Sequence, residues 1–238
     1  SELDVFDEGK SLIIHSSHTL QEKKAVLEVG HWPERTLYLH LSALYAQGVD
    51  EIQIISQEEI SNEITKYISD LIGFALVSQN NIMYTIKDLS GGNYPHLDDI
   101  FKRVFQMILL FYDAAEQDIF GKEKGTLENL KKRDVEVNKF CLYLQRAINK
   151  MSYADAINGR ILFTYSYMLE KISDEIERLW RTNIKYKVKK TNAIHELMTL
   201  SREGLSKAFD LYYQFNPKKI SEIYTLREKV REDSFVLP

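Results

Sequence analysis

From residue 97 onward, apolar residues recur three and four positions apart over unusually long stretches. This spacing places the apolar side chains on one face of an α-helix. At 1.5 Å per residue, a helix of about 30 residues spans roughly 45 Å, which is typical of a helical bundle. The sequence therefore predicts a bundle of long helices over residues 97–120, 126–150, 155–186 and 193–215, followed by the start of another helix over 220–231.

The chain changes character at the sequence Gly91-Gly92-Asn93-Tyr94-Pro95, whose glycines and proline interrupt regular structure. Before this point, short runs of β-forming residues alternate with helical patterns. We expect residues 21–90 to form a small α/β module in the order β-α-β-α-β-β. The expected strands are 25–29, 51–55, 74–78 and 83–86, with helices from Pro33 to Ala46 and from Ser56 or Gln57 to Gly73.

The first 16 residues have the pattern of a β-hairpin. Two runs of β-forming residues flank the turn sequence Asp7-Glu8-Gly9-Lys10. An isolated hairpin is marginally stable in water, so it must pack on other chain or pair with it. We therefore expect a homodimer or higher oligomer, assembled through the hairpin or through the α/β module.

Composition excludes several classes of function. The 238 residues include 31 basic and 35 acidic side chains, and a net charge of -4 gives no global attraction to nucleic acid or to an anionic membrane. The single cysteine, Cys141, excludes an intramolecular disulfide framework. No apolar run is long enough to span a bilayer, and the acidic N-terminus lacks the apolar core of a signal peptide. We expect a cytoplasmic protein without a membrane span.

Two pairs of oxygen-bearing side chains are the candidate site. Glu170 and Asp174 lie four residues apart on one predicted helix, and Asp134 and Asn138 lie four apart on the preceding one. Residues at this spacing share a helix face, so two adjacent helices can direct four oxygen ligands at one ion. Such ligands suit Mg²⁺, Mn²⁺ or Ca²⁺, and carboxylate clusters in bundles also hold iron.

An ordinary charged surface is the alternative interpretation of the same residues, with the acids paired to nearby basic side chains. Two details favour the site. Asp134 lies one turn before Val137, on the apolar stripe of its helix, and Asn138 is uncharged where an exposed helix more often carries lysine or glutamate. The basic side chains available for pairing are Lys171, Arg178 and Arg181.

Both motifs resemble those of PhoU-domain proteins, the phosphate-uptake regulators. Residues 169–176, Leu-Glu-Lys-Ile-Ser-Asp-Glu-Ile, are similar to the signature of that domain's third helix, in which Glu, Ile and Asp occupy the same offsets. Residues 133–138, Arg-Asp-Val-Glu-Val-Asn, resemble the acidic motif of its second helix. The resemblance implies an antiparallel three-helix repeat whose acidic motifs hold metal ions, with Asp134, Glu170 and Asp174 as ligands; Asn138 departs from the usual acid.

A second, incomplete repeat follows from the same resemblance. The first repeat would occupy residues 95–187, and the second would begin within 190–238. Glu228 and Glu232 fall where the second repeat would carry its own metal ligands. We expect the natural protein to continue beyond Pro238, where the remainder of this repeat would lie.

The N-terminal residues 1–14 are similar to the second half of the AbrB swapped-hairpin fold, which certain archaeal-type proteins join to an α/β module and a PhoU domain. The half of that fold that contacts DNA would precede Ser1. The resemblance implies a phosphate-responsive regulator of transcription, acting through DNA, and not an enzyme.

Two alternatives are an adaptor that modulates a phosphate transporter or its sensor, and a plain interaction module without metal. A carboxylate-metal enzyme is a further one, although the long helices lack the E-x-x-H motif of di-iron bundles.

Overall fold

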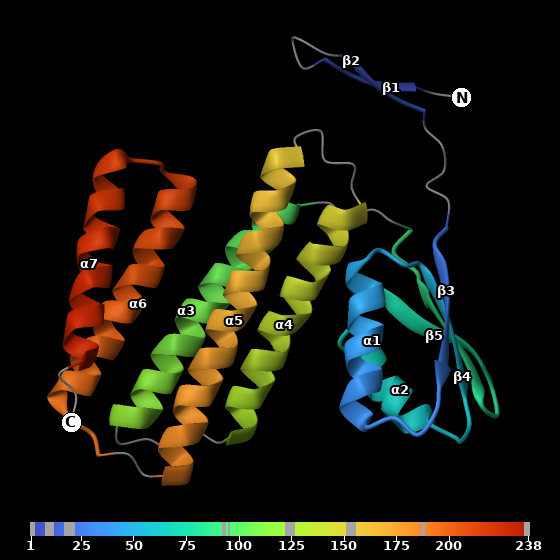
Figure 1. Cartoon of the computed structure of the whole chain (residues 1–238), viewed down its shortest axis with the longest axis horizontal. Helices are drawn as coiled ribbons and strands as arrows, with labels where there is room; N and C mark the ends of the chain where they lie inside the picture. The colour runs from blue at the N-terminus through green and yellow to red at the C-terminus, as the bar shows by residue number, and fades with distance from the viewer. Residues whose placement is uncertain are drawn as a thin grey trace. The chain divides into compact units, whose positions relative to one another are not determined.

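The computed structural model describes residues 3–7, 12–16, 22–91, 94, 96–121, 127–150, 156–186 and 189–235. The chain is mainly helical, with a small α/β module toward its N-terminus, as the sequence predicts (Figure 1). It divides into two compact units, one of residues 1–97 and 139–167 and the other of residues 98–138 and 168–238. The unit boundaries fall at the first residue of α3 and inside α4 and α5, so α4 and α5 each contribute to both units.

The predicted N-terminal hairpin is present. Its strands β1 (Leu3–Asp7) and β2 (Leu12–Ser16) pair antiparallel, with Leu3 opposite Ser16 and Asp7 opposite Leu12. Residues 8–11, in the connection between the strands, lie outside the described residues.

The α/β module has the predicted order of elements. Its four strands lie in the order β3-β4-β6-β5, with β3 and β4 parallel and the other neighbours antiparallel. Both helices of the module cover one face of this sheet (Figure 1). The elements are β3 (Lys24–Val29), α1 (Glu34–Ala46), β4 (Glu51–Ser56), α2 (Ser61–Ile68), β5 (Phe74–Asn80) and β6 (Met83–Asp88).

Alternation of buried and exposed residues builds the module's core. Every second residue of β4 is buried, and Ile52 and Ile54 are fully enclosed with Leu41 of α1. Tyr84 of β6 is also buried, and its hydroxyl accepts a hydrogen bond from the Ile60 backbone N–H, at the start of α2. This bond satisfies a donor that the helix itself leaves unpaired. It also explains why α2 begins after Ile60 and not at the predicted Ser56 or Gln57.

The long helices follow the predicted boundaries closely. They are α3 (Leu97–Phe120), α4 (Leu127–Lys150), α5 (Ala156–Tyr186), α6 (Asn192–Tyr213) and α7 (Pro217–Phe235). The side chain of Thr191 caps α6 by accepting a hydrogen bond from the Ile194 backbone N–H at 3.3 Å. The largest difference from the prediction is in α7, which begins at Pro217 and not at Ile220, and ends at Phe235 and not at Arg231. Proline suits the first position of a helix because its missing N–H would be unpaired there anyway.

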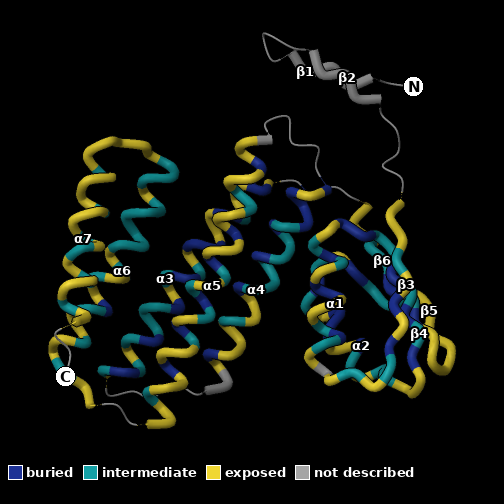
Figure 2. Tube along the Cα trace, viewed as in Figure 1, coloured by how far each residue is buried: buried dark blue, intermediate teal, exposed yellow. Residues whose placement is uncertain are grey.

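In the second unit, α3 packs on α6 through aromatic rings and ion pairs. The ring centroids of Phe105 and Phe209 are 5.2 Å apart. Beside them, Asp113 accepts two hydrogen bonds from the guanidinium of Arg202, at 2.8 and 3.0 Å. The α5 side chain Trp180 is buried and donates its indole N–H to Asp118 of α3. By contrast, α7 has no buried residue among those described (Figure 2).

No helix in the described ranges combines the length and the apolar character needed to cross a membrane.

Candidate functional site

Asp134, on the part of α4 that belongs to the second unit, is the centre of the predicted site. Its side chain is partly buried, because it lies one turn before the buried Val137 on the apolar face of the helix. Oδ1 of Asp134 accepts a hydrogen bond from the Ser173 hydroxyl of α5 at 2.8 Å. Ser173 is itself fully buried, so this bond joins α4 to α5 in the interior of the unit.

Asn138 completes the α4 half of the site. Its Nδ2 donates to Oδ2 of Asp134 at 3.2 Å, as expected for side chains four residues apart on a helix. Its Oδ1 atom is buried and accepts no hydrogen bond from the described part of the chain. A buried oxygen without a hydrogen-bond donor costs free energy of folding, so this atom is suited to accept a hydrogen bond from a ligand or to contact a cation.

Glu170 and Asp174 of α5 are joined by a lysine between them. Nζ of Lys171 lies 3.0 Å from Oε2 of Glu170 and 3.0 Å from Oδ2 of Asp174. These two bonds, the one to Glu170 first, raise the pKa of Lys171 above its usual value. The pairing with Lys171 is the one that the charged-surface interpretation anticipates. Below, the term acidic face denotes Asp134, Asn138, Glu170 and Asp174.

The two halves of the acidic face act on each other electrostatically. Burial raises the pKa of Asp134 above its usual value, and the hydrogen bond from Ser173 only partly opposes this rise. The negative charges of three α5 carboxylates, Asp174, Glu177 and Glu170, raise it further. Ionised Asp134 is therefore in an unfavourable environment that an added cation would relieve.

The fit to a metal ion is incomplete. Carboxylate and amide oxygens are the donors that hard cations prefer, and the unpartnered oxygen of Asn138 agrees with such a role. However, the described residues contain no group of three or more His, Cys, Asp or Glu side chains placed to hold one ion. In this structure Lys171 is bonded to two of the predicted ligands, so the acidic face is not a preformed coordination shell.

The candidates in the predicted second repeat lie apart from these residues on α7. Glu228 pairs with Arg227 at 2.8 Å and with Arg231 at 3.8 Å, both on its own helix. Glu232 is exposed, on a helix without buried residues. These two acids are therefore not brought together with other acidic side chains into a metal-binding group in the described ranges.

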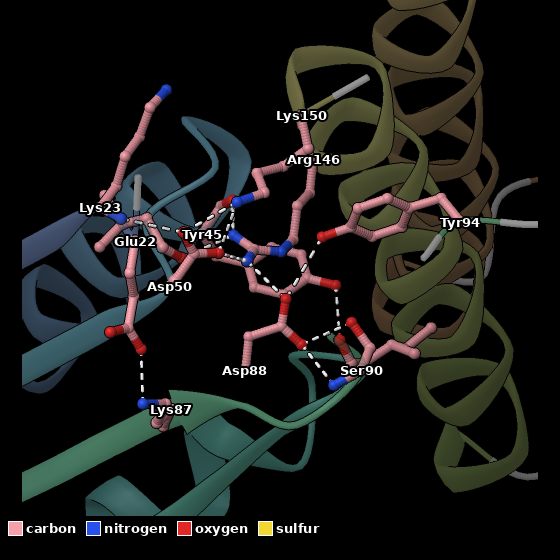
Figure 3. Close-up of polar contacts among 12 residues, drawn as sticks. Glu22, Lys23, Tyr45, Asp50, Lys87, Asp88, Ser90, Tyr94, Arg146 and Lys150 are labelled. Atoms are coloured by element: carbon pink, nitrogen blue, oxygen red, sulfur yellow. Dashed lines mark hydrogen bonds and ion pairs between the residues drawn. The ribbon is translucent and has the colours of Figure 1, made fainter. Parts of the chain in front are cut away.

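A second cluster of charges, which the sequence analysis does not identify, lies in the first unit (Figure 3). The guanidinium of Arg146, on the last part of α4, is almost completely buried, with 1% of the side chain exposed. It donates to the backbone carbonyls of Tyr45 and Val49, at 3.0 and 2.7 Å. It also donates to the carboxylates of Asp50 and Asp88, at 2.9 and 2.7 Å.

Neighbouring groups complete this cluster. Lys150, one turn beyond Arg146, places Nζ 2.7 Å from Asp50, so two cations meet two carboxylates. Oδ1 of Asp88 accepts bonds from the backbone N–H and the hydroxyl of Ser90, at 2.8 and 2.6 Å (Figure 3). Burial alone would raise the pKa of Asp88, but the bonds from Ser90 and Arg146 outweigh burial and lower it.

The role of this second cluster is to hold α4 at one end of the two central strands of the sheet. Asp50 precedes β4 and Asp88 ends the antiparallel β6, so both acids lie at the same end of these strands. A sequence signal for the cluster exists: Arg146 is followed by the apolar pair Ala147-Ile148, where a solvent-facing helix would be polar. Among the buried side-chain polar atoms of this cluster, Nε of Arg146 alone accepts or donates no hydrogen bond within the described residues, so we assign the cluster a structural role.

Comparisons of the chain with protein-family models, with curated proteins and with solved structures find no match. The fold and the site therefore define a class only: a mainly helical protein with a small α/β module and a partly buried acidic face between two long helices.

Proposed function

We propose that this protein is a regulator that responds to phosphate status, and that its acidic face binds a divalent or trivalent metal ion. The observation that carries the proposal is the accumulation of carboxylates around a half-buried Asp134, next to an amide oxygen of Asn138 without a donor. Mg²⁺, Mn²⁺, Ca²⁺ and iron ions accept such ligands. The resemblance of both motifs to those of PhoU-domain proteins supports the same assignment.

Metal binding has to compete with Lys171. Because Nζ of Lys171 bonds to both Glu170 and Asp174, a cation that used either carboxylate would displace the ammonium group. The Lys171→Ala variant should therefore bind Mn²⁺ more tightly than the natural chain, and Asp134→Asn should bind it more weakly. Glu175→Gln removes an acid that is 64% exposed on the same helix, and this matched control should not change the affinity.

Isothermal titration with Mn²⁺, Mg²⁺, Ca²⁺ and Fe³⁺, together with elemental analysis of the purified protein, measures these affinities. If neither the natural chain nor Lys171→Ala takes up any of these ions, the acidic face is an ordinary charged surface and the proposed metal binding is wrong. Equal affinity of Asp134→Asn and the natural chain would place the bound ion elsewhere.

The regulatory role is tested in the organism that encodes the protein. Deletion of the gene should uncouple phosphate uptake from external phosphate, and the natural gene should restore the coupling. The Asp134→Asn gene, expressed to the same level, should restore it poorly if the acidic face is needed. Unchanged regulation of phosphate uptake after deletion would contradict the proposal.

An adaptor that acts on a phosphate transporter or its sensor is a second candidate. The net charge of -4 favours a protein partner over DNA for the residues present here, because DNA binding depends on clustered basic side chains. A transcriptional regulator would differ from an adaptor by binding duplex DNA with a steep salt dependence.

A further inference from the structure

Strand β3 is at one edge of the four-stranded sheet, and within the described residues no strand pairs with its outer side. The backbone carbonyl of Lys23 accepts hydrogen bonds from the N–H groups of Asp50 and Glu51, so Lys23 faces β4. Backbone groups alternate in direction along a strand. The N–H and C=O groups of Lys24, Val26 and Glu28 therefore point away from β4, toward the open edge.

The side chains of the same three residues lie on the sheet face opposite the helices. All three are exposed, and Val26 is 60% exposed. The charge pattern is basic, apolar, acidic, so opposite charges lie at equal distances on either side of Val26. When two such strands pair antiparallel with Val26 opposite Val26, each Lys24 lies opposite Glu28 of the second copy. The pattern is thus complementary to itself, as a twofold interface requires.

Other registers lack this complementarity. Outward-facing residues can pair only with outward-facing residues, so the twofold axis must coincide with a residue. An axis at Lys24 or at Glu28 would place two like charges directly opposite each other, which leaves Ala25, Val26 and Leu27. An axis at Ala25 places Glu28 opposite Glu22 of the second copy, and like charges directly opposite each other are destabilising. An axis at Leu27 places Glu28 opposite Val26 and leaves Lys24 opposite Gly30. Only the axis at Val26 pairs each charge with its opposite.

Lys24 does not block this edge as an isolated lysine would. Edge strands are often protected from pairing by an uncompensated charge. Here Nζ of Lys24 is 3.1 Å from Glu51 and 3.4 Å from Glu22, so its charge is already balanced. Glu51 pairs in turn with Lys87 on the neighbouring strand. Addition of Glu28 from a second copy would extend this row, in which the sign of the charge alternates from strand to strand.

We propose that β3 binds β3 of a second copy of this chain, antiparallel and with the twofold axis at Val26, so that the two four-stranded sheets become one continuous sheet. Each opposed pair of outward-facing residues exchanges two backbone hydrogen bonds, and the Lys24–Glu28 pairs fix the register. On the helix side, Ala25 lies opposite Leu27, which extends the apolar layer across the junction. This interface does not depend on the metal or on the regulatory role.

Chemical crosslinking of the whole chain tests the register. Opposed residues in a hydrogen-bonded antiparallel pair have Cα atoms about 5.5 Å apart, within reach of a short bis-maleimide. Val26→Cys should give a covalent dimer, whereas Val77→Cys, on the other edge strand and 47% exposed, should react with the reagent but crosslink far more slowly. The natural Cys141 is buried and gives the background. Equal crosslinking of the two variants would overturn the proposal.

Charge reversal tests the same interface. In the Val26→Cys background, Glu28→Lys places Lys24 opposite a lysine, which should weaken self-association by about tenfold. In the same Val26→Cys background, Lys24→Glu without the Glu28 change should weaken self-association to the same extent, with folding verified by circular dichroism. Mixing these two variants restores both opposite-charge pairs, so the mixture should crosslink as a heterodimer. Unchanged crosslinking of the Glu28→Lys protein, or no crosslinking in the mixture, would show that this register is wrong.

Discussion

The backbone conformation and the neighbours of Gly48 leave no room for a side chain at this position. Gly48 follows α1 with φ of +82°, a conformation that L-residues rarely adopt, and a Cβ atom placed there would lie 2.9 Å from Cδ of Lys150. Gly48→Ala should destabilise the protein by about 1–3 kcal/mol, from backbone strain and from displacement of Lys150. Urea unfolding measures this change.

Gly30→Ala is the matched control for that substitution. Gly30 has an ordinary φ, and a Cβ atom there would have no neighbour within 4 Å. The control should change the free energy of unfolding by less than about 0.5 kcal/mol. Equal effects at the two glycines would contradict the steric argument.

Asp134 should give the protein a characteristic pH dependence. Because its pKa is raised in the folded state, ionisation costs stability as the pH rises above the unfolded value, near 3.8. Asp134→Asn should therefore stabilise the metal-free protein at pH 7, by an amount on the order of 1 kcal/mol. The advantage should disappear below the unfolded pKa, where the carboxyl group is protonated in both states.

Thermal unfolding at a series of pH values, with a chelator present, checks this prediction. Glu175→Gln removes an exposed acid of the same helix and should show no such dependence. A loss of stability in Asp134→Asn at pH 7 would mean that the bond from Ser173 needs the full negative charge.

At the scale of elements, Arg146 is the most buried of the side chains that attach α4 to the sheet, beside Lys150, which pairs with Asp50. Arg146→Met should cost about 3–5 kcal/mol, because the buried carboxylate of Asp88 would lose its cation. Arg178→Met, at a position that is 64% exposed, should cost little. Denaturant unfolding of both variants measures the difference.

A double variant separates lost charge from lost packing. Addition of Asp88→Asn to Arg146→Met should recover part of the lost free energy of unfolding, because it removes the negative charge that has lost its cation. No recovery would indicate that the packing of Arg146 on the rings of Tyr45 and Phe74, 5.0 and 4.8 Å from its guanidinium carbon, dominates.

The elements themselves are largely predictable from local pattern. The apolar period of 3.6 residues predicts the limits of α3, and Gly48 and Pro217 indicate where α1 and α6 end. The predicted end of α2 at Gly73 is wrong, because this helix already ends at Ile68. The start of α2 was not predictable, because it depends on Tyr84, more than twenty residues later. The Arg146 cluster is predictable only in part: the apolar residues that follow Arg146 indicate its burial, but Asp50 and Asp88 are distant in sequence and give no sign that they will surround it.

The candidate site is only partly predictable, because spacing places residues on a face but does not choose their partners. The spacing of Asp134 and Asn138 correctly indicates that their side chains meet. The role of Ser173, between the two acidic residues of α5, depends on how α4 and α5 pack and has no signal in either helix alone. Lys171 could equally have pointed into solvent.

For the whole molecule, the net charge of -4 predicts weak binding to duplex DNA by the residues present here. Non-specific DNA binding is supplied mainly by basic side chains that neutralise phosphates. We expect a dissociation constant weaker than about 100 µM at physiological salt, with a shallow salt dependence. A gel-shift titration at several salt concentrations measures both, and tight, steeply salt-dependent binding would reveal a DNA-binding surface on this chain.

The Arg146 cluster also has a consequence for synthesis on the ribosome. Arg146 contacts Asp88, Asp50 and the Tyr45 carbonyl across sequence separations of 58, 96 and 101 residues. At about 5–20 residues per second, translation needs roughly 3–12 s to pass from Asp88 to Arg146. During that interval Asp50 and Asp88, at one end of the nascent sheet, lack the cations of α4. We therefore expect the α/β module to reach its full stability only after this helix, encoded well downstream, has emerged from the ribosome.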